Sequence, residues 1–229
     1  MRSFTDIVSE DCEMKGNLQT IVYAAVLGAI CGSLLAGVNQ LTGPYKEANA
    51  QAERIRNVLE VLQIQFSKES DPQELAQVFT ANVREEKFGE LPVYVCADLQ
   101  DKDKIKSVAA AFEGRGLWGP IRGFLALRPD MRTIQDITFY EQEETPGVGG
   151  QIASSWFRER FKSRKIIDAD GKSGIRIRRG GGALAENEVD AITGATMTCK
   201  KLETILNETI KKIVRAYPAV RRPVENNDE

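Results

Sequence analysis

The sequence predicts one membrane-spanning helix followed by a single α+β domain. The stretch from Gly16 to Tyr45 contains no charged residue over 30 positions. The 185 residues after Pro44 are enough for one domain with its own core. They mix helix and strand patterns without a regular βαβ rhythm, which favours the α+β class over the α/β class.

The membrane helix is predicted over residues 18–38. These 21 residues would be about 30 Å long at a rise of about 1.5 Å per residue, which matches a hydrocarbon core. A cleaved signal peptide is the main alternative, but the apolar run is too long and no small-residue cleavage site follows it. Gly28 and Gly32 lie on one stripe of small residues, which fits a lone anchor or packing against another membrane helix.

The remaining elements follow from apolar spacing and turn signals. Apolar residues recur at helical spacing over 55–66, so a helix is expected to continue from the membrane edge. Asp71 followed by Pro72 is typical of an N-cap that opens a short helix. The later predicted elements are a strand at 91–96, a hairpin of 121–127 with 134–140, a short helix capped by Ser154 or Ser155, a strand at 175–179 and an amphipathic helix over 202–217.

We therefore divide the chain into four parts. They are an N-terminal segment at 1–17, the membrane helix at 18–38, the folded domain at 45–218 and a polar tail at 219–229.

Composition excludes several kinds of site. The chain has no histidine, which excludes Ser-His-Asp and Cys-His catalysis and histidine-ligated metals. Four scattered cysteines without a C-x-x-C pair argue against a zinc or iron–sulfur centre. With 31 basic and 33 acidic residues, the chain has no excess of positive charge to attract the phosphates of a nucleic acid. The function should therefore depend on carboxylates, hydroxyls or a bound cofactor, with no metal.

Three glycine-marked segments carry the candidate site. Asp190–Thr198 places small residues and hydroxyls before a helix, which is typical of an anion-binding helix N-terminus. Its plain alternative is a helix capped by Thr196 or Thr198. Glu141–Gly150 is either a loop whose backbone approaches a ligand or a solvated acidic loop. Gly114–Pro120 displays a tryptophan, either to a ligand or for packing.

In their combination and order, the three segments resemble the FMN-binding domain family. That family includes NqrC, which belongs to the sodium-translocating NADH:quinone reductase, and RnfG, which belongs to the Rnf electron-transport complex. Its Ser/Thr-Gly-Ala-Thr-x-Ser/Thr signature corresponds to Thr193–Thr198, its Glu-Thr-Pro-Gly-x-Gly segment to Glu144–Gly149 and its Gly-Leu-Trp turn to Gly116–Trp118. The likeness covers nearly the whole chain. One departure is Gln142, where many relatives carry histidine.

The resemblance implies a domain with a mainly antiparallel sheet and a covalent FMN, joined by a phosphoester bond to Thr196. A separate flavin transferase would attach it, because the chain offers no histidine base to activate the hydroxyl. The same resemblance assigns nine further residues to cofactor binding: Thr193, Gly194, Ala195, Thr198, Glu144, Thr145, Gly147, Leu117 and Trp118.

The implied function is electron relay within a sodium-translocating NADH:quinone reductase, as one component of the complex rather than a self-contained catalyst. The resemblance also implies a single-pass protein of the bacterial inner membrane, with the flavin domain on the extracytoplasmic side. Its partners would be the lipid bilayer and the other membrane, flavin and iron–sulfur subunits. An RnfG-type protein of the Rnf complex and a non-redox, membrane-anchored flavin-binding module stay open as alternatives. In an oxidising compartment Cys96 and Cys199 could pair.

Overall fold

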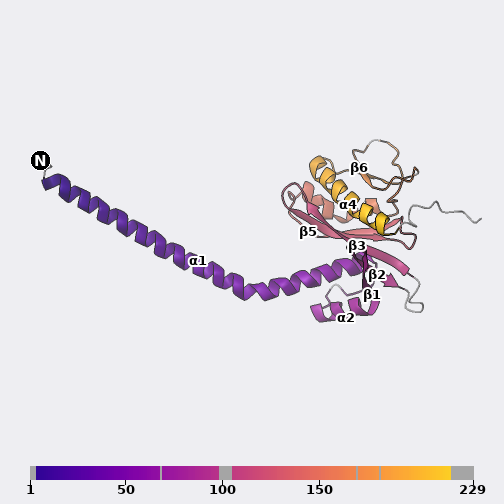
Figure 1. The fold of residues 1–229 in the computed structure, drawn as a ribbon, viewed down its shortest axis with the longest axis horizontal. Helices are drawn as coiled ribbons and strands as arrows, with labels where there is room; N and C mark the ends of the chain where they lie inside the picture. Colours follow the sequence, from indigo (N-terminus) through magenta and orange to yellow (C-terminus); the bar gives the residue numbers. More distant parts are fainter. Residues whose placement is uncertain (1–3, 68, 98–104, 169, 181, 218–229) are drawn as a thin grey trace, which may run out of the picture. The chain divides into compact units, whose positions relative to one another are not determined.

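The computed structural model describes residues 4–67, 69–97, 105–168, 170–180 and 182–217 (Figure 1). The chain divides into two compact units, Met1–Ala50 and Gln51–Glu229. The predicted polar tail at 219–229 lies outside the described residues.

Helix α1 runs from Phe4 to Val61 and includes the predicted membrane segment, with Pro44 inside it. Its part from Gln19 onward is long and apolar enough to cross a membrane, with a mean hydropathy of 2.2 over its most apolar window. The helix prediction over 55–66 was too long at its C-terminal end. After Val61 the chain turns, and Gln63 takes a φ of 58° that a continuing helix does not allow.

A five-stranded antiparallel sheet forms the centre of the second unit. Its strands follow one another in space in chain order, so the sheet is a meander, and each pairs antiparallel with the next (Figure 1). This arrangement confirms the predicted α+β class with an antiparallel sheet. The strands are β1 (Val83–Phe88), β2 (Leu91–Ala97), β3 (Ile105–Arg115), β4 (Pro120–Leu127) and β5 (Ile134–Gln142).

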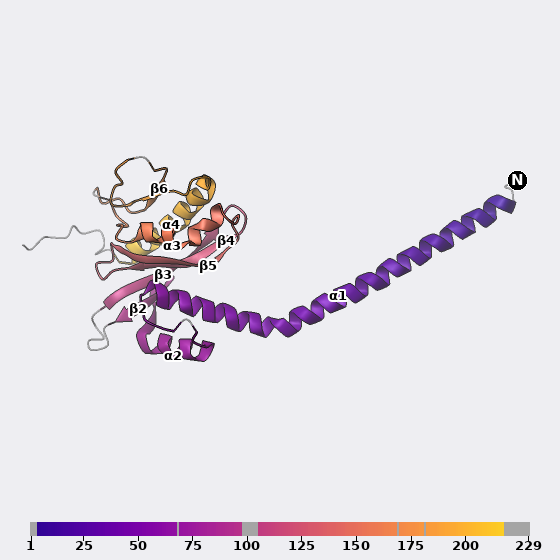
Figure 2. The ribbon, with the colours of Figure 1, turned by 180° about the vertical axis from the view of Figure 1, so that it is seen from behind.

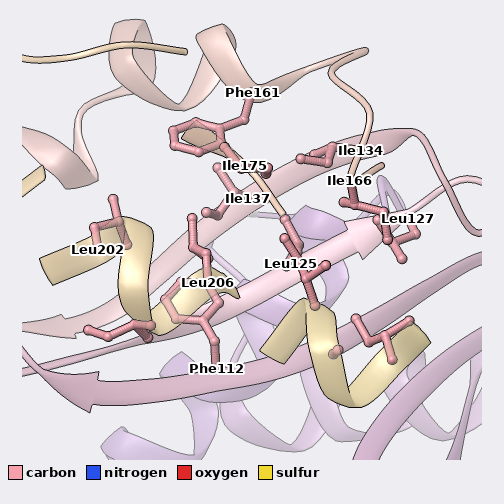
Figure 3. Packing of buried hydrophobic residues seen from close by; sticks show 14 of the residues in the cluster. Phe112, Leu125, Leu127, Ile134, Ile137, Phe161, Ile166, Ile175, Leu202 and Leu206 are labelled. Carbon is pink, nitrogen blue, oxygen red and sulfur yellow. The ribbon is translucent and has the colours of Figure 1, made fainter. Parts of the chain in front are cut away.

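Alternating side chains of the strands feed two separate hydrophobic clusters, one on each face of the sheet. On one face the sheet packs against α4 (Thr196–Ala216), with Leu206 directed towards Phe112 of β3 (Figure 3). On the other face it packs against the last turns of α1 and against α2 (Pro72–Asn82) (Figure 2). Three short helices complete the α4 side: η1 (Gly149–Ala153), α3 (Ser155–Arg158) and η2 (Glu159–Phe161).

Most of the predicted elements are confirmed. Asp71 caps α2 through hydrogen bonds of 2.8 Å from the amides of Gln73 and Glu74. The strand at 91–96, the hairpin and the amphipathic helix ending before Pro218 are also present. Ser154 is the N-cap of α3 by position, although its side chain makes no capping hydrogen bond.

A parallel pair of short strands, β6 (Arg176–Arg178) and β7 (Glu188–Asp190), leads into the segment before α4. The strand predicted at 175–179 corresponds to β6. Strands β1, β3 and β7 were not predicted.

Cys96 and Cys199 do not pair in this structure. Both side chains are buried, and neither forms a disulfide. Cys96 belongs to the cluster beside α1 and α2, whereas Cys199 belongs to the cluster beside α4, so the sheet lies between them.

Candidate functional site

The carboxylate of Glu144 joins the three segments that the sequence analysis singled out. Glu144 follows β5 and is only 4% exposed. Its Oε1 accepts hydrogen bonds from the backbone amides of Leu117 (2.7 Å) and Trp118 (3.2 Å). Its Oε2 accepts a hydrogen bond of 2.6 Å from the hydroxyl of Thr198, 54 residues away. One buried side chain therefore holds the Gly-Leu-Trp turn against the first turn of α4.

Two glycines of the motifs make room for this carboxylate. A Cβ atom at Gly116 would overlap Oε1 of Glu144. A Cβ atom at Gly149 would lie 2.7 Å from Oγ1 of Thr198 and 3.0 Å from the Cβ of Glu144. These glycines thus serve close packing within the protein, a use that the sequence patterns did not distinguish from approach to a ligand.

The loop after Glu144 is folded by its own backbone. The carbonyl of Thr145 accepts hydrogen bonds from the amides of Val148 (3.2 Å) and Gly150 (2.9 Å). Gly147 has a φ of +74°, in the left-handed region that glycine enters without strain. Thr145 and Gly147 are exposed, so this loop lies on the surface beside the Glu144 contacts.

Gln142, which the sequence analysis singled out as a departure from the family pattern, contacts the backbone of Glu144. Its Oε1 accepts a hydrogen bond of 2.8 Å from the backbone amide of Glu144. This side chain therefore orients the backbone of the residue that joins the three segments. Sequence reasoning noted the substitution but did not predict the contact.

The segment before α4 ends without a side-chain cap. Ala195 is the N-cap residue, and the first helical hydrogen bond runs from the amide of Cys199 to its carbonyl at 2.9 Å. Thr196 is the first residue of the helix, and the hydroxyl of Thr198 donates to Glu144. The plain alternative of a cap by either threonine is therefore wrong. Gly194, with a φ of +83°, turns the chain into the helix.

The start of α4 offers donors to an anion. In the part of the chain that the structure describes, the amides of Thr196, Met197 and Thr198 donate no hydrogen bond. The helix dipole adds partial positive charge at the same place. Thr193, Gly194 and Thr196 are exposed, whereas Ala195 and Thr198 are buried. Thr196 is thus an exposed hydroxyl residue beside these amides.

Arg160 holds the same segment from the side of η2. Its guanidinium donates hydrogen bonds to the carbonyls of Asp190 (2.9 Å) and Ala191 (3.3 Å), and it lies 4.7 Å from the centroid of the Trp156 ring. Sequence reasoning missed Arg160. The only available signal was its i, i+4 spacing from Trp156, which places both on one side of a helical segment.

Large apolar side chains remain exposed around these segments. A cavity of about 500 Å³ lies beside the turn and is lined by residues that include Arg115, Trp118 and Glu143. Exposed apolar groups next to free amides fit a ligand with a flat ring and a phosphate. The exposed side chains are Leu117 (41%), Trp118 (68%), Val148 (40%), Trp156 (44%) and Met197 (59%).

These features fit FMN. The Thr196 hydroxyl and the three amides could hold a phosphoester, and the exposed apolar side chains could cover an isoalloxazine ring. Among the residues the structure describes, no cluster of three or more His, Cys, Asp or Glu side chains could hold a metal ion.

Comparison with known proteins finds a matching family for part of the domain. Residues 116–211 match the FMN-binding domain family. The matched range begins at the Gly-Leu-Trp turn and ends within α4, so it contains Glu144 and the residues that its carboxylate contacts, Leu117, Trp118 and Thr198.

The two relatives described next carry the same protein name. NqrC of Neisseria meningitidis, from the Na+-translocating NADH-quinone reductase, is 40% identical over 100 residues, which cover 44% of this chain. The chain spans only 39% of the length of that relative. NqrC of Haemophilus ducreyi is 26% identical over 221 residues, covering 80% of this chain and 86% of the relative. The resemblance drawn from the three motifs is therefore confirmed: the chain is similar to these NqrC proteins.

A solved structure confirms the fold. The crystal structure of NqrC from Shewanella oneidensis matches with a TM-score of 0.63 and 23% identity. The match covers 75% of this chain and 99% of that chain.

Proposed function

We propose that this chain is a membrane-anchored flavoprotein subunit that carries FMN on Thr196 and relays electrons within a Na+-translocating NADH:quinone reductase. The observation that carries the proposal is the exposed Thr196 hydroxyl at the first position of α4, beside three free amides and inside the site assembled by Glu144. The names of the relatives favour this complex over the Rnf complex.

The attachment step transfers FMN from FAD to the threonine. The Thr196 oxygen forms a bond to the phosphorus of the FMN half, the phosphoanhydride bond breaks, AMP leaves and the hydroxyl proton is released. A threonine hydroxyl needs a base for this attack, and the chain contains no histidine. A separate, magnesium-dependent flavin transferase is therefore the catalyst we propose. The free amides of α4 would stabilise the remaining negative charge.

The protein's own residues would position the cofactor rather than transfer protons. FMN, once attached, supplies the electron-transfer chemistry. Leu117 and Trp118 would cover the ring and exclude water from it, since both are exposed on the turn that Glu144 holds. Thr193, Gly194 and the loop of Thr145 and Gly147 would border the phosphate and the ribityl chain.

The apolar helix gives the proposed location. Helix α1 would anchor the chain in the bacterial inner membrane, because its most apolar window is unburied and long enough to span the bilayer. It carries no Asp, Glu, Lys, Arg or His between Gly16 and Tyr45, so ion movement would belong to partner subunits. The remaining membrane, flavin and iron–sulfur subunits of the complex would be the partners.

The test is the mass and flavin fluorescence of the chain produced together with a flavin transferase. The wild-type chain should gain one FMN adduct and fluoresce in a denaturing gel, and Thr196→Val should lose both signals. Thr204→Val is the matched control, because Thr204 is exposed on the same helix and bonds only to the carbonyl of Lys200. An unmodified wild-type chain, or a Thr196→Val chain that keeps the adduct, would overturn the proposal.

A further inference from the structure

We propose that Glu144 is a positioning residue that sets the Trp118 turn relative to Thr196 before the flavin is attached, and so fixes the orientation of the ring. This inference deepens the proposed function and rests on it for the identity of the ligand. It assigns Glu144 an indirect role, whereas the family resemblance groups it with the residues that bind the cofactor.

The first argument is that protein donors occupy both carboxylate oxygens. Oε1 is shared by the amides of Leu117 and Trp118, and Oε2 takes the hydroxyl of Thr198. The side chain is 4% exposed, so a carboxylate in this place needs such partners to be stable. Both oxygens of Glu144 therefore already have hydrogen-bond partners within the protein. Glu144 would affect a ligand indirectly, by fixing the positions of Leu117, Trp118 and Thr198.

The second argument comes from a comparison within the chain. Asp130 also accepts from two consecutive amides, those of Arg132 and Thr133, at 2.9 Å each, and from the hydroxyl of Thr133 at 2.6 Å. Those partners lie two or three residues away, so Asp130 closes only its own turn. Glu144 makes the same set of contacts across 26, 27 and 54 residues.

The third argument is the position of the two segments that the Glu144 carboxylate joins, the Trp118 turn and the first turn of α4. On one side lies Trp118, 68% exposed on its turn. On the other side lies Thr198, two residues after the proposed attachment point and on the same helical turn. A flavin attached to Thr196 has its ring several bonds from the phosphate, so only a fixed turn can give the ring one orientation. Glu144 supplies that link, and the lack of a Cβ at Gly116 and Gly149 permits it.

The test uses the full-length chain without flavin, so that it does not depend on the proposed function. Hydrogen exchange of the Leu117 and Trp118 amides is measured in the wild type, in Glu144→Ala and in Glu144→Gln. Glu144→Ala should speed exchange at these two amides at least tenfold. Glu144→Gln should keep most of the protection, because its amide oxygen can still accept from both N–H groups while its nitrogen donates to Thr198.

Asp130→Ala is the matched control. It should speed exchange at Arg132 and Thr133 and leave Leu117 and Trp118 unchanged, because it breaks the equivalent contacts in another turn. Unchanged exchange at Leu117 and Trp118 in Glu144→Ala would overturn the proposal. If Glu144→Ala does not fold, Thr198→Val replaces it, since it removes one end of the link and keeps the carboxylate. Unchanged exchange at the two amides in that variant would count equally against the proposal.

A second measurement uses the flavin-loaded chain. Mass spectrometry first shows whether FMN is attached, which tests the proposed function separately. Among loaded proteins, Glu144→Ala should lose at least half of the visible circular dichroism of the flavin, and Glu144→Gln should restore it. Identical visible spectra in wild type and Glu144→Ala would overturn the positioning role even where attachment succeeds.

Discussion

Asp130 shows how a single carboxylate stabilises a turn in this domain. It closes the connection between β4 and β5 through the amides of Arg132 and Thr133 and the hydroxyl of Thr133. Burial alone would raise its pKa, but these hydrogen bonds favour the charged form more strongly and the pKa lies below 3.8. The charged side chain therefore stabilises the folded state.

Asp130→Asn should lower the free energy of unfolding at pH 7 by roughly 1 kcal/mol, since the side chain is exposed enough for water to weaken its contacts. Because the pKa is lower in the folded state, the stabilisation is complete above the ordinary pKa of an aspartate and disappears as the pH falls through the pKa of the folded state. Urea unfolding of both proteins at several pH values measures this difference. A difference that does not shrink as the pH falls below the ordinary range of an aspartate would contradict the explanation.

The candidate site could be predicted only in part from its residues. Motif order indicated which three segments meet, and the structure does bring them together at Glu144. The roles of the individual residues could not be predicted, because a glutamate that binds a ligand and a glutamate that binds distant backbone amides look the same in sequence. Thr198 illustrates this limit: the pattern offered it as a helix cap, and its hydroxyl instead donates to a carboxylate 54 residues away.

At the scale of elements, the most informative failure is β3, the central strand. Its sequence includes Val108-Ala109-Ala110-Ala111-Phe112, a run without alternation, because both faces of the strand are covered. Gly114 is small for a related reason, since a Cβ there would lie 2.5 Å from the Ile205 side chain of α4. Strand β1 was missed for the opposite reason: four of its six residues are exposed and charged. The hairpin was predicted because its two apolar runs flank a turn signal, Arg128-Pro129-Asp130, and α4 was predicted because it buries one face only.

Helix α4 carries both the proposed attachment point and a large share of the core. Leu206 is fully buried against the sheet, near Phe112 and Leu125 (Figure 3). Leu206→Ala should lower the free energy of unfolding by about 2–5 kcal/mol, because it removes apolar contacts and leaves a cavity. Chemical denaturation measures the change.

The matched control on the same helix is Lys201→Ala. Lys201 is exposed, so its substitution should change the free energy of unfolding by less than about 0.5 kcal/mol. Equal effects of the two substitutions would contradict the packing described for α4.

At the scale of the whole chain, the side of the membrane on which the domain lies is open to a direct test. Alkaline phosphatase, which is active only outside the cytoplasm, is fused after residue 229, and a cytoplasm-active reporter is fused at the same position in a second chain. We expect activity from the first fusion and none from the second, because the proposed single span would place the domain on the extracytoplasmic side. Activity of the cytoplasmic reporter alone would reverse the proposed topology.

The sheet also determines how the domain behaves before it receives a flavin. The outer edge of β5 is covered by the chain itself: the amide of Ile134 donates to the carbonyl of Arg164 at 2.8 Å, and Arg158 donates to the carbonyl of Ile137 at 2.6 Å. The opposite edge strand, β1, presents Arg-Glu-Glu-Lys to solvent.

Covered or charged edges are poor templates for a strand from another molecule. The apolar side chains around Thr196 lie on a turn, a loop and helices, which cannot extend a sheet. A newly folded chain can therefore expose these side chains to the proposed transferase without pairing edge to edge with other copies of itself.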